Sequence, residues 1–149
     1  MSIKIYTDGA CIGNPGPGGW AAVIIEKDKN EELFGGEKMT TNNRMELTAV
    51  IKALEYCNFK IDEQADFKYL KIFTDSTYVK EGITVWINKW EKNNWKTSNK
   101  KEVKNKDLWE KLKKLIGNKK IDWIWVKGHS GDAMNDLVDT SNKEHERIN

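Results

Sequence analysis

Cysteine, histidine and long hydrophobic runs are scarce in this chain of 149 residues, which has two cysteines and two histidines. Cys11 and Cys57 cannot form a disulfide framework, and their spacing is not that of a zinc site. No hydrophobic run approaches the length that crosses a bilayer, so we expect no membrane association. Residues 3–7 already alternate as a strand does, and no signal-peptide pattern precedes them. These absences favour a protein of the reducing cytoplasm.

Charge, by contrast, is abundant, since 32% of the residues are charged and 38% are hydrophobic. This composition and length are typical of one folded domain, which we expect to span residues 1–149. The net charge of +2 conceals an uneven distribution, because residues 86–114 hold ten lysines and four acids, a local net charge of +6. The chain is thus a mildly acidic body with one basic, tryptophan-bearing segment, a pattern that indicates an anionic partner.

Hydrophobic periodicity predicts an α/β fold. Thr41 or Asn42 can cap a helix whose apolar stripe is Leu47, Val50, Ile51 and Leu54. A helical crossover before the fourth strand makes that strand parallel to an earlier one. We therefore expect a five-stranded mixed sheet, with three antiparallel strands then two parallel ones, flanked by helices. The predicted strands are residues 3–7, 20–25, 32–38, 69–74 and 121–126; the later helices are 76–82 and 84–92, separated at Gly82, one around Leu108, Leu112 and Leu115, and one from Asp132; residues 93–104 are an exposed loop.

Three acids stand where such a sheet could bring them together. Asp8 and Asp75 each follow a β-branched, hydrophobic run, and Glu46 flanks the apolar stripe of the first long helix. Taken singly, Asp8 could shape an Asp-Gly turn, Asp75 could cap a helix, and Glu46 could be a solvated edge residue. If the first and fourth strands are adjacent and parallel, however, both aspartates emerge at one sheet edge. Clustered carboxylates raise one another's pKa, and an all-oxygen ligand set favours Mg²⁺ or Mn²⁺ over zinc.

Several ordered motifs, spread over nearly the whole chain, are similar to those of the bacterial type I ribonuclease H family. They are Thr7-Asp8-Gly9, the glycine-rich stretch 11–19, Thr40-Thr41-Asn42-Asn43-Arg44-Met45-Glu46-Leu47, Thr74-Asp75-Ser76, and residues 82–87, 95–97, 103–105 and 125–131. The resemblance implies a ribonuclease H-like fold and an endonuclease that cuts the RNA strand of RNA–DNA hybrids, leaving 5′-phosphate and 3′-hydroxyl ends. It also implies two Mg²⁺ ions, for which Mn²⁺ can substitute, and a monomer with no obligate protein partner.

The resemblance assigns catalytic roles to five residues. Asp8, Glu46, Asp75 and Asp139 would be metal ligands, with Asp132 and Asp136 as rivals of Asp139 that match the motif less well. His129, in the Gly-His-Ser-Gly loop, would move protons near neutral pH and help to release product. Without the resemblance, an ordinary solvated side chain is the better interpretation of His129.

The resemblance also divides the substrate contacts between the two strands. The expected contacts to the RNA strand are Gly9, Cys11, Asn14, Asn42, Asn43 and Ser76. Those to the DNA strand, on a basic protrusion around residues 86–106 and beside it, are Thr41, Trp86, Trp90, Lys96, Ser98, Lys100, Lys101, Lys104 and Asn105. We assign Trp20, Trp109, Trp123 and Trp125 to the core. The chain departs from the family pattern at Thr77, where relatives often carry a longer amide, and in the polar stretch 140–143.

Two other functions compete with hybrid cleavage. A module that binds hybrids without cutting them would gain nothing from acids beside phosphates. A resolvase or transposase core could share the sheet and the acids, but the paired Asn42 and Asn43 and the basic tryptophan segment favour hybrid recognition.

Overall fold

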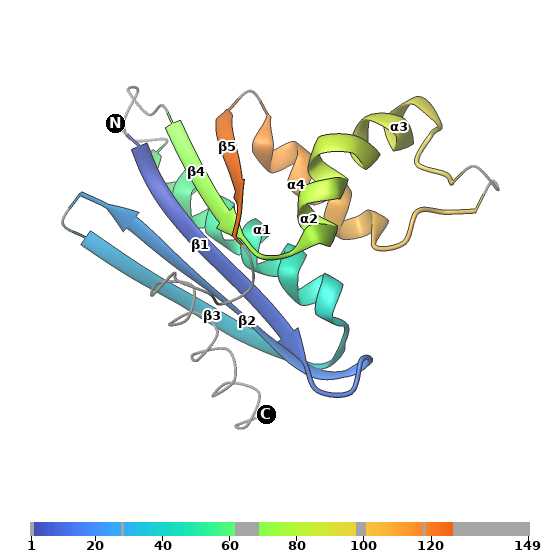
Figure 1. Cartoon of the computed structure of the whole chain (residues 1–149), viewed down its shortest axis with the longest axis horizontal. Coiled ribbons are helices and arrows are strands. Elements are labelled where there is room, and N and C mark those ends of the chain that lie inside the picture. The colour runs from blue at the N-terminus through green and yellow to red at the C-terminus, as the bar shows by residue number, and fades with distance from the viewer. Residues whose placement is uncertain (1, 28, 62–68, 98–100, 118, 127–149) are drawn as a thin grey trace.

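The computed structural model describes residues 2–27, 29–61, 69–97, 101–117 and 119–126, and these form a five-stranded sheet with helices packed on it (Figure 1). The strands are β1 (Ser2–Cys11), β2 (Gly16–Glu26), β3 (Lys29–Thr40), β4 (Tyr69–Thr74) and β5 (Lys120–Trp125). The helical segments are α1 (Asn42–Ile61), α2 (Thr77–Glu81), η1 (Gly82–Trp86), α3 (Ile87–Lys92) and α4 (Lys106–Ile116). None of the helices within these ranges is long and apolar enough to cross a membrane.

The sheet order is β3-β2-β1-β4-β5, which confirms the predicted fold class. Strands β1, β2 and β3 pair antiparallel, and β4 pairs parallel with both β1 and β5. The short connections between the first three strands allow only antiparallel neighbours, whereas α1 carries the chain back for the parallel pairing. The first and fourth strands are therefore adjacent, as the argument about the acids required.

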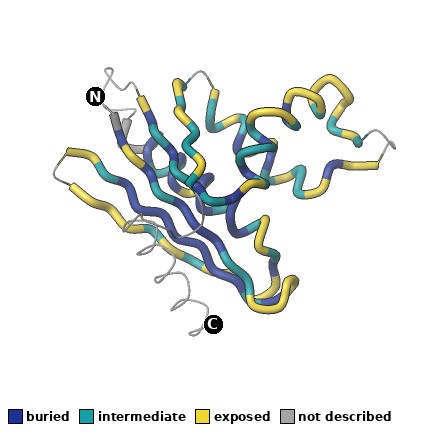
Figure 2. Tube along the Cα trace, viewed as in Figure 1, coloured by how far each residue is buried: buried dark blue, intermediate teal, exposed yellow. Residues whose placement is uncertain are grey.

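Helix α1 lies across one face of the sheet and buries the predicted stripe (Figure 2). Leu47, Val50 and Leu54 are fully buried and pack with Ile5 of β1 and Ile72 of β4. Burying each such side chain contributes about 1.5–3 kcal/mol. This packing fixes the position of α1 relative to β1 and β4, and hence of any polar residue on the same helix.

Gly82 does not separate two helices, contrary to the prediction. It has right-handed helical dihedrals (φ −61°, ψ −45°), and the chain stays helical from α2 through the π-helical η1 into α3. A β-carbon on Gly82 would collide with the Trp109 ring, so glycine is needed here for close packing against α4. The residue allows a close helix–helix contact and does not end a helix.

The tryptophans also depart from the prediction in part. Trp109 is fully buried, Trp20 is buried and Trp123 packs on the core, but Trp125 is 42% exposed near the end of β5. Trp90, an expected DNA-strand contact, and Trp95 both pack against the main core. Their rings continue a series of contacts that starts at Tyr78 and includes Trp86 and Trp109. The base of the protrusion is therefore an aromatic extension of the core.

Candidate active site

Three carboxylates from three elements converge at one edge of the sheet. Each of Asp8, Glu46 and Asp75 offers an oxygen atom, and these atoms lie within 4.8 Å of one another. Asp75 is the first residue after β4, as predicted. Asp8 is not at a strand end, because β1 continues to pair with β2 as far as Cys11. Phe73 of β4 pairs with Tyr6 of β1, so Asp75 and Asp8 each follow that pair by two residues.

Glu46 reaches this edge because α1 crosses β1 with almost no space between the two backbones. A β-carbon on Gly9 would lie 2.5 Å from the Glu46 backbone nitrogen and 2.7 Å from the Met45 carbonyl oxygen. Only glycine permits that approach. The approach places Glu46 against Gly9, and therefore next to Asp8. Glu46 is 9% exposed and Asp8 is 3% exposed, so neither is a solvated surface acid.

The electrostatics of the cluster favour a bound cation. Burial raises the pKa of Glu46 well above its usual value, and the charges of Asp8 and Asp75 raise it further. Among the described residues, Glu46 Oε2 is buried and has no hydrogen-bond partner. The Gly9 N–H donates to Asp8 Oδ1 at 2.9 Å, which orients that carboxylate. Buried, mutually repelling oxygen ligands fit a hard divalent cation, which would offset their charge.

Asp75 is not a helix cap, which excludes the simpler interpretation of this residue. The N-cap of α2 is Ser76, whose Oγ accepts the Val79 N–H at 3.1 Å. The Ser76 N–H in turn donates to Thr74 Oγ1 at 3.1 Å. Asp75 therefore lies between two residues whose own polar groups define the turn, and the N-cap position itself belongs to Ser76.

The acids open into a cleft of about 430 Å³. Most residues expected to contact the RNA strand line it. Its lining comprises Asp8, Gly9, Ala10, Cys11, Asn42, Asn43, Glu46, Asp75, Ser76, Thr77 and Tyr78. Asn14 is joined to this cleft because its Oδ1 accepts the Asn42 N–H at 3.1 Å. The amides and the carboxylates thus share one concave surface.

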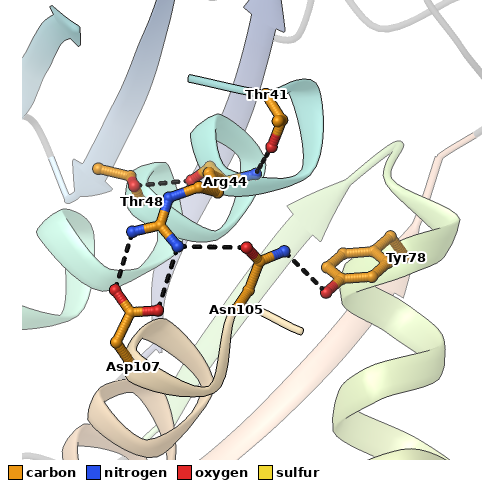
Figure 3. A network of polar contacts seen from close by, with 6 residues as sticks. All are labelled: Thr41, Arg44, Thr48, Tyr78, Asn105 and Asp107. Atoms are coloured by element: carbon orange, nitrogen blue, oxygen red, sulfur yellow. Dashed lines mark hydrogen bonds and ion pairs between the residues drawn. The ribbon is translucent and has the colours of Figure 1, made fainter. Parts of the chain in front are cut away.

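Two of the expected DNA-strand contacts, Thr41 and Asn105, both bond to Arg44 in a polar network centred on that residue (Figure 3). The Arg44 N–H donates to Thr41 Oγ1 at 3.2 Å, and its guanidinium donates to Asn105 Oδ1 at 3.2 Å. It also pairs with Asp107 at 2.8 Å, which raises the pKa of Arg44 and lowers that of Asp107. Asn105 Nδ2 donates to Tyr78 Oη at 3.1 Å. We call these five residues the Arg44 network.

Sequence reasoning missed the roles of Arg44, Tyr78 and Asp107. Arg44 belongs to a quoted motif, but its partner Asp107 is 63 positions further along the chain. No local periodicity reports such a contact. The one available signal was the position of Asp107, two residues after the motif residue Asn105. Asn105 has a left-handed conformation (φ 61°) and is the N-cap of α4. Asparagine tolerates that conformation better than most residues.

The basic segment divides into exposed and paired lysines. Lys96, Lys101 and Lys104 are exposed, and α3 and the segment after it project from the sheet (Figure 1). Trp86 and Trp90 are half-buried behind them. Other lysines of the segment form ion pairs: Lys106 with Glu102, Lys111 with Glu55 and Lys113 with Glu91. The predicted exposed loop also contains one buried residue, Val103.

Four expected site residues lie outside the described residues: Ser98, Lys100, His129 and Asp139. The rivals Asp132 and Asp136 and the helix predicted from Asp132 lie there too.

The sequence is similar to known ribonucleases H over almost its whole length. A family model described as RNase H matches residues 1–146. The chain is 52% identical, over 153 aligned positions, to Ribonuclease H of Treponema denticola, with 93% of each chain covered. It is 54% identical over 138 positions to Ribonuclease H of Wolbachia pipientis wMel, covering 93% of this chain and 90% of the relative.

Solved structures share the fold at lower sequence identity. LC9-RNase H1, described as a type 1 RNase H with the type 2 active-site motif, gives a TM-score of 0.81 at 26% identity, with 99% of this chain and 72% of that chain covered. LC11-RNase H1 in complex with RNA/DNA hybrid gives 0.75 at 24% identity, with 98% and 97% covered. The second likeness bears on the fold alone.

Proposed function

The chain belongs to the RNase H family, and on that premise we propose that it is an endonuclease that hydrolyses the RNA strand of RNA–DNA hybrids, leaving 5′-phosphate and 3′-hydroxyl ends. One observation carries the proposal. Asp8, Glu46 and Asp75 converge within 4.8 Å in a cleft that is also lined by Asn42 and Asn43. Carboxylates suit metal-dependent phosphoryl chemistry, and asparagine amides suit the sugar edge of a nucleic acid.

The RNase H family is metal-dependent, and we propose two Mg²⁺ ions for this chain, with Mn²⁺ as a substitute. Asp8, Glu46 and Asp75 would hold them, with Asp139 as the fourth ligand. When bound, a pair of such cations supplies an activated water and offsets the charge that develops on the scissile phosphate. The buried Oε2 of Glu46, which has no hydrogen-bond partner in the described part of the chain, supports this assignment.

The remaining catalytic work falls to side chains that move protons and orient the substrate. We assign proton transfer near neutral pH to His129, since an imidazole titrates in that range. Gly9 holds one oxygen of Asp8 through its N–H, so that the carboxylate presents a fixed face to the cleft. Ser76 fixes the start of α2 and thereby the turn that carries Asp75.

Recognition of RNA would depend on the residues beside the acids. Asn42 and Asn43 are exposed at the start of α1, and both line the cleft. Their amides can donate to and accept from 2′-hydroxyl groups, which distinguish RNA from DNA. Asn14 holds the first backbone N–H of α1, so it would orient this pair. Cys11, Gly9 and Ser76 complete the surface for the RNA strand.

The DNA strand would follow the protrusion. Thr41 and Asn105 would contact a phosphate at the Arg44 network, and Trp86 and Trp90 would lie against deoxyriboses. Lys96, Lys101 and Lys104, together with Lys100 and Ser98, would contact further phosphates. We further propose that the enzyme acts as a monomer in the cytoplasm.

A cleavage assay with labelled substrates tests this function. The purified protein with Mg²⁺ is expected to cut the RNA of a hybrid, to spare duplex DNA and duplex RNA, and to stop when EDTA is added. Asp8→Asn is expected to abolish turnover while hybrid binding, measured by anisotropy, survives. Asp122→Asn, which alters an exposed acid on β5, is the matched control and should cleave at the wild-type rate.

Two results would contradict the proposal. Cleavage by Asp8→Asn at the wild-type rate, with an unchanged circular dichroism spectrum, would exclude Asp8 as a ligand. Tight hybrid binding by the wild-type protein without any cleavage in Mg²⁺ or Mn²⁺ would instead identify a binding module.

A further inference from the structure

Trp125 is the one tryptophan that we placed wrongly in the core, and its indole is hydrogen-bonded to the main chain. Its indole Nε1–H donates to the backbone carbonyl of Asp75 at 3.2 Å. The ring is 42% exposed, so core packing alone does not hold it in place. The indole is partly exposed, and its N–H is directed at the backbone of Asp75, one of the three clustered acids. Burial does not explain this arrangement.

The backbone around Asp75 is held on both sides by two neighbouring residues, Trp125 at the end of β5 and Val126 directly after it. On its N-terminal side, the Thr74 carbonyl accepts the Val126 N–H at 2.9 Å. On its C-terminal side, the Asp75 carbonyl accepts the Trp125 indole. Strand β4 ends at Thr74 and α2 begins at Thr77, so Asp75 lies in the turn between them. The indole bond joins this turn to β5.

Lys80 restricts the indole from the other side. Its Nζ lies 5.4 Å from the centre of the Trp125 ring, within the range of a cation–π contact. Lys80 lies in the last turn of α2, and its N–H donates to the Ser76 carbonyl at 3.1 Å. The ring is therefore held by a contact from α2 and by its own bond to the residue that precedes α2.

We propose that Trp125 is a positioning residue that fixes the Asp75 peptide, and thereby the Asp75 carboxylate, for metal binding. Lys80 supports it by limiting rotation of the indole. This inference rests on the proposed function only in taking Asp75 as a metal ligand. It concerns Trp125 of β5 and Lys80 of α2, which the expected ligand and substrate contacts do not include.

The test is metal binding by the free protein, which does not depend on catalysis. Trp125→Phe keeps an aromatic ring for Lys80 but removes the indole donor. The affinity for Mn²⁺, measured by titration calorimetry and electron paramagnetic resonance, is expected to fall about 3- to 10-fold, the usual range for loss of one hydrogen bond. Trp123→Phe, on the same strand but at a residue that packs on the core, is the control and should bind Mn²⁺ as the wild type does.

Cleavage kinetics give a second readout. For Trp125→Phe the metal concentration at half-maximal rate should rise by a similar factor, whereas the KM for the hybrid should stay unchanged. Melting temperatures of both variants establish that any difference is not a loss of fold. Wild-type Mn²⁺ affinity in folded Trp125→Phe would overturn the proposal, and so would a raised KM with unchanged metal dependence, since Trp125 would then contact the substrate itself.

Lys80→Met keeps the aliphatic stem and removes the charge. A weaker effect in the same direction is expected, and the double variant with Trp125→Phe should match Trp125→Phe alone, because both changes act through one ring. Additive effects would overturn the role given to Lys80. If the wild-type protein bound Mn²⁺ through the cluster but cut no hybrid, the proposed function would fail while this test would still decide the role of Trp125.

Discussion

The backbones of Gly9 and Glu46 lie so close that a β-carbon on Gly9 would fall 2.5 Å from the Glu46 nitrogen. This contact joins the C-terminal part of β1 to the second turn of α1, and it brings a helix carboxylate beside a strand carboxylate. The position of α1 is set by its buried leucines, but the distance between the two acids depends on the absence of a side chain at Gly9. The acidic cluster is therefore a consequence of packing as much as of charge.

Gly9→Ala should move α1 away from β1. Overpacking of this kind typically costs about 1–3 kcal/mol of unfolding free energy, which urea denaturation can measure. Because the shift separates Glu46 from Asp8, Mn²⁺ affinity should fall as well. Gly82→Ala is the matched control, since its β-carbon would collide with Trp109, away from the acids. It should lose comparable stability and keep its Mn²⁺ affinity; equal loss of affinity in both variants would contradict the argument.

Glu46→Gln should stabilise the metal-free protein at neutral pH. The pKa of Glu46 is raised in the folded state, so folding becomes less favourable as pH rises from the ordinary glutamate value to the folded one. The variant lacks this penalty and should be more stable above that range by about 1–3 kcal/mol, the cost of a poorly satisfied buried group. Urea unfolding in EDTA between about pH 4.5 and pH 8 measures the difference.

Added Mg²⁺ provides the complementary result for Glu46→Gln. A ligand that binds only the folded state stabilises it, so the wild type should gain stability with Mg²⁺ and the variant much less. Glu55→Gln, on the same helix but half-exposed and paired with Lys111, should behave as the wild type does. Stability curves of wild type and Glu46→Gln that run parallel at all pH values would contradict the raised pKa.

Much of the sheet and the convergence of the acids could be predicted from the sequence, because both depend on local patterns. Hydrophobic alternation marks the strands, and Asp75 directly follows one of them. Asp8 was placed in the right region for a partly wrong reason. The hydrophobic run that precedes it ends there, but β1 is prolonged by its antiparallel pairing with β2 through glycine-rich residues that carry no strand signal.

The wrong predictions share a different cause, namely contacts between residues far apart in the chain. Gly82 has the composition of a helix end, yet Trp109, 27 positions later, requires glycine inside a continuous helix. Trp125 alternates with Trp123 as a core residue would, but the turn after β4 gives its indole a backbone acceptor at the sheet edge. The partner of Arg44 is equally invisible to a local pattern.

Arg44→Met should weaken both stability and hybrid binding. Arg44 and Asp107 are 31% and 64% exposed, so their ion pair should contribute only about 0.5–1 kcal/mol. The pKa of Asp107 is lowered by Arg44, so this contribution is present above the ordinary aspartate pKa and is lost as pH falls through the folded value. The stability gap between wild type and variant should therefore close in acid, which thermal unfolding across pH can follow.

Hybrid binding separates the structural and recognition roles of Arg44. Without the Arg44 guanidinium, Asn105 loses the donor to its Oδ1 and is held by its bond to Tyr78 Oη. Arg44→Lys keeps the charge but cannot reach Asn105 and Asp107 at once with forked geometry, so its hybrid affinity should lie between those of wild type and Arg44→Met. If Arg44→Met had wild-type affinity at every salt concentration, the network would serve stability alone.

The exposed and the ion-paired lysines should differ in how they affect the salt dependence of hybrid binding. Each phosphate contact contributes about 0.7–0.9 to the slope of log affinity against log salt. Lys96→Gln and Lys101→Gln should each flatten the slope by about that amount, because both side chains are exposed on the projecting segment. Lys111→Gln is the control, since Lys111 pairs with Glu55 at 3.4 Å and should leave the slope unchanged. If Lys111→Gln flattened the slope and Lys96→Gln and Lys101→Gln did not, the DNA strand would lie along α4 and not along the protrusion. The reason is that the lysine that releases counterions is the one that faces a phosphate.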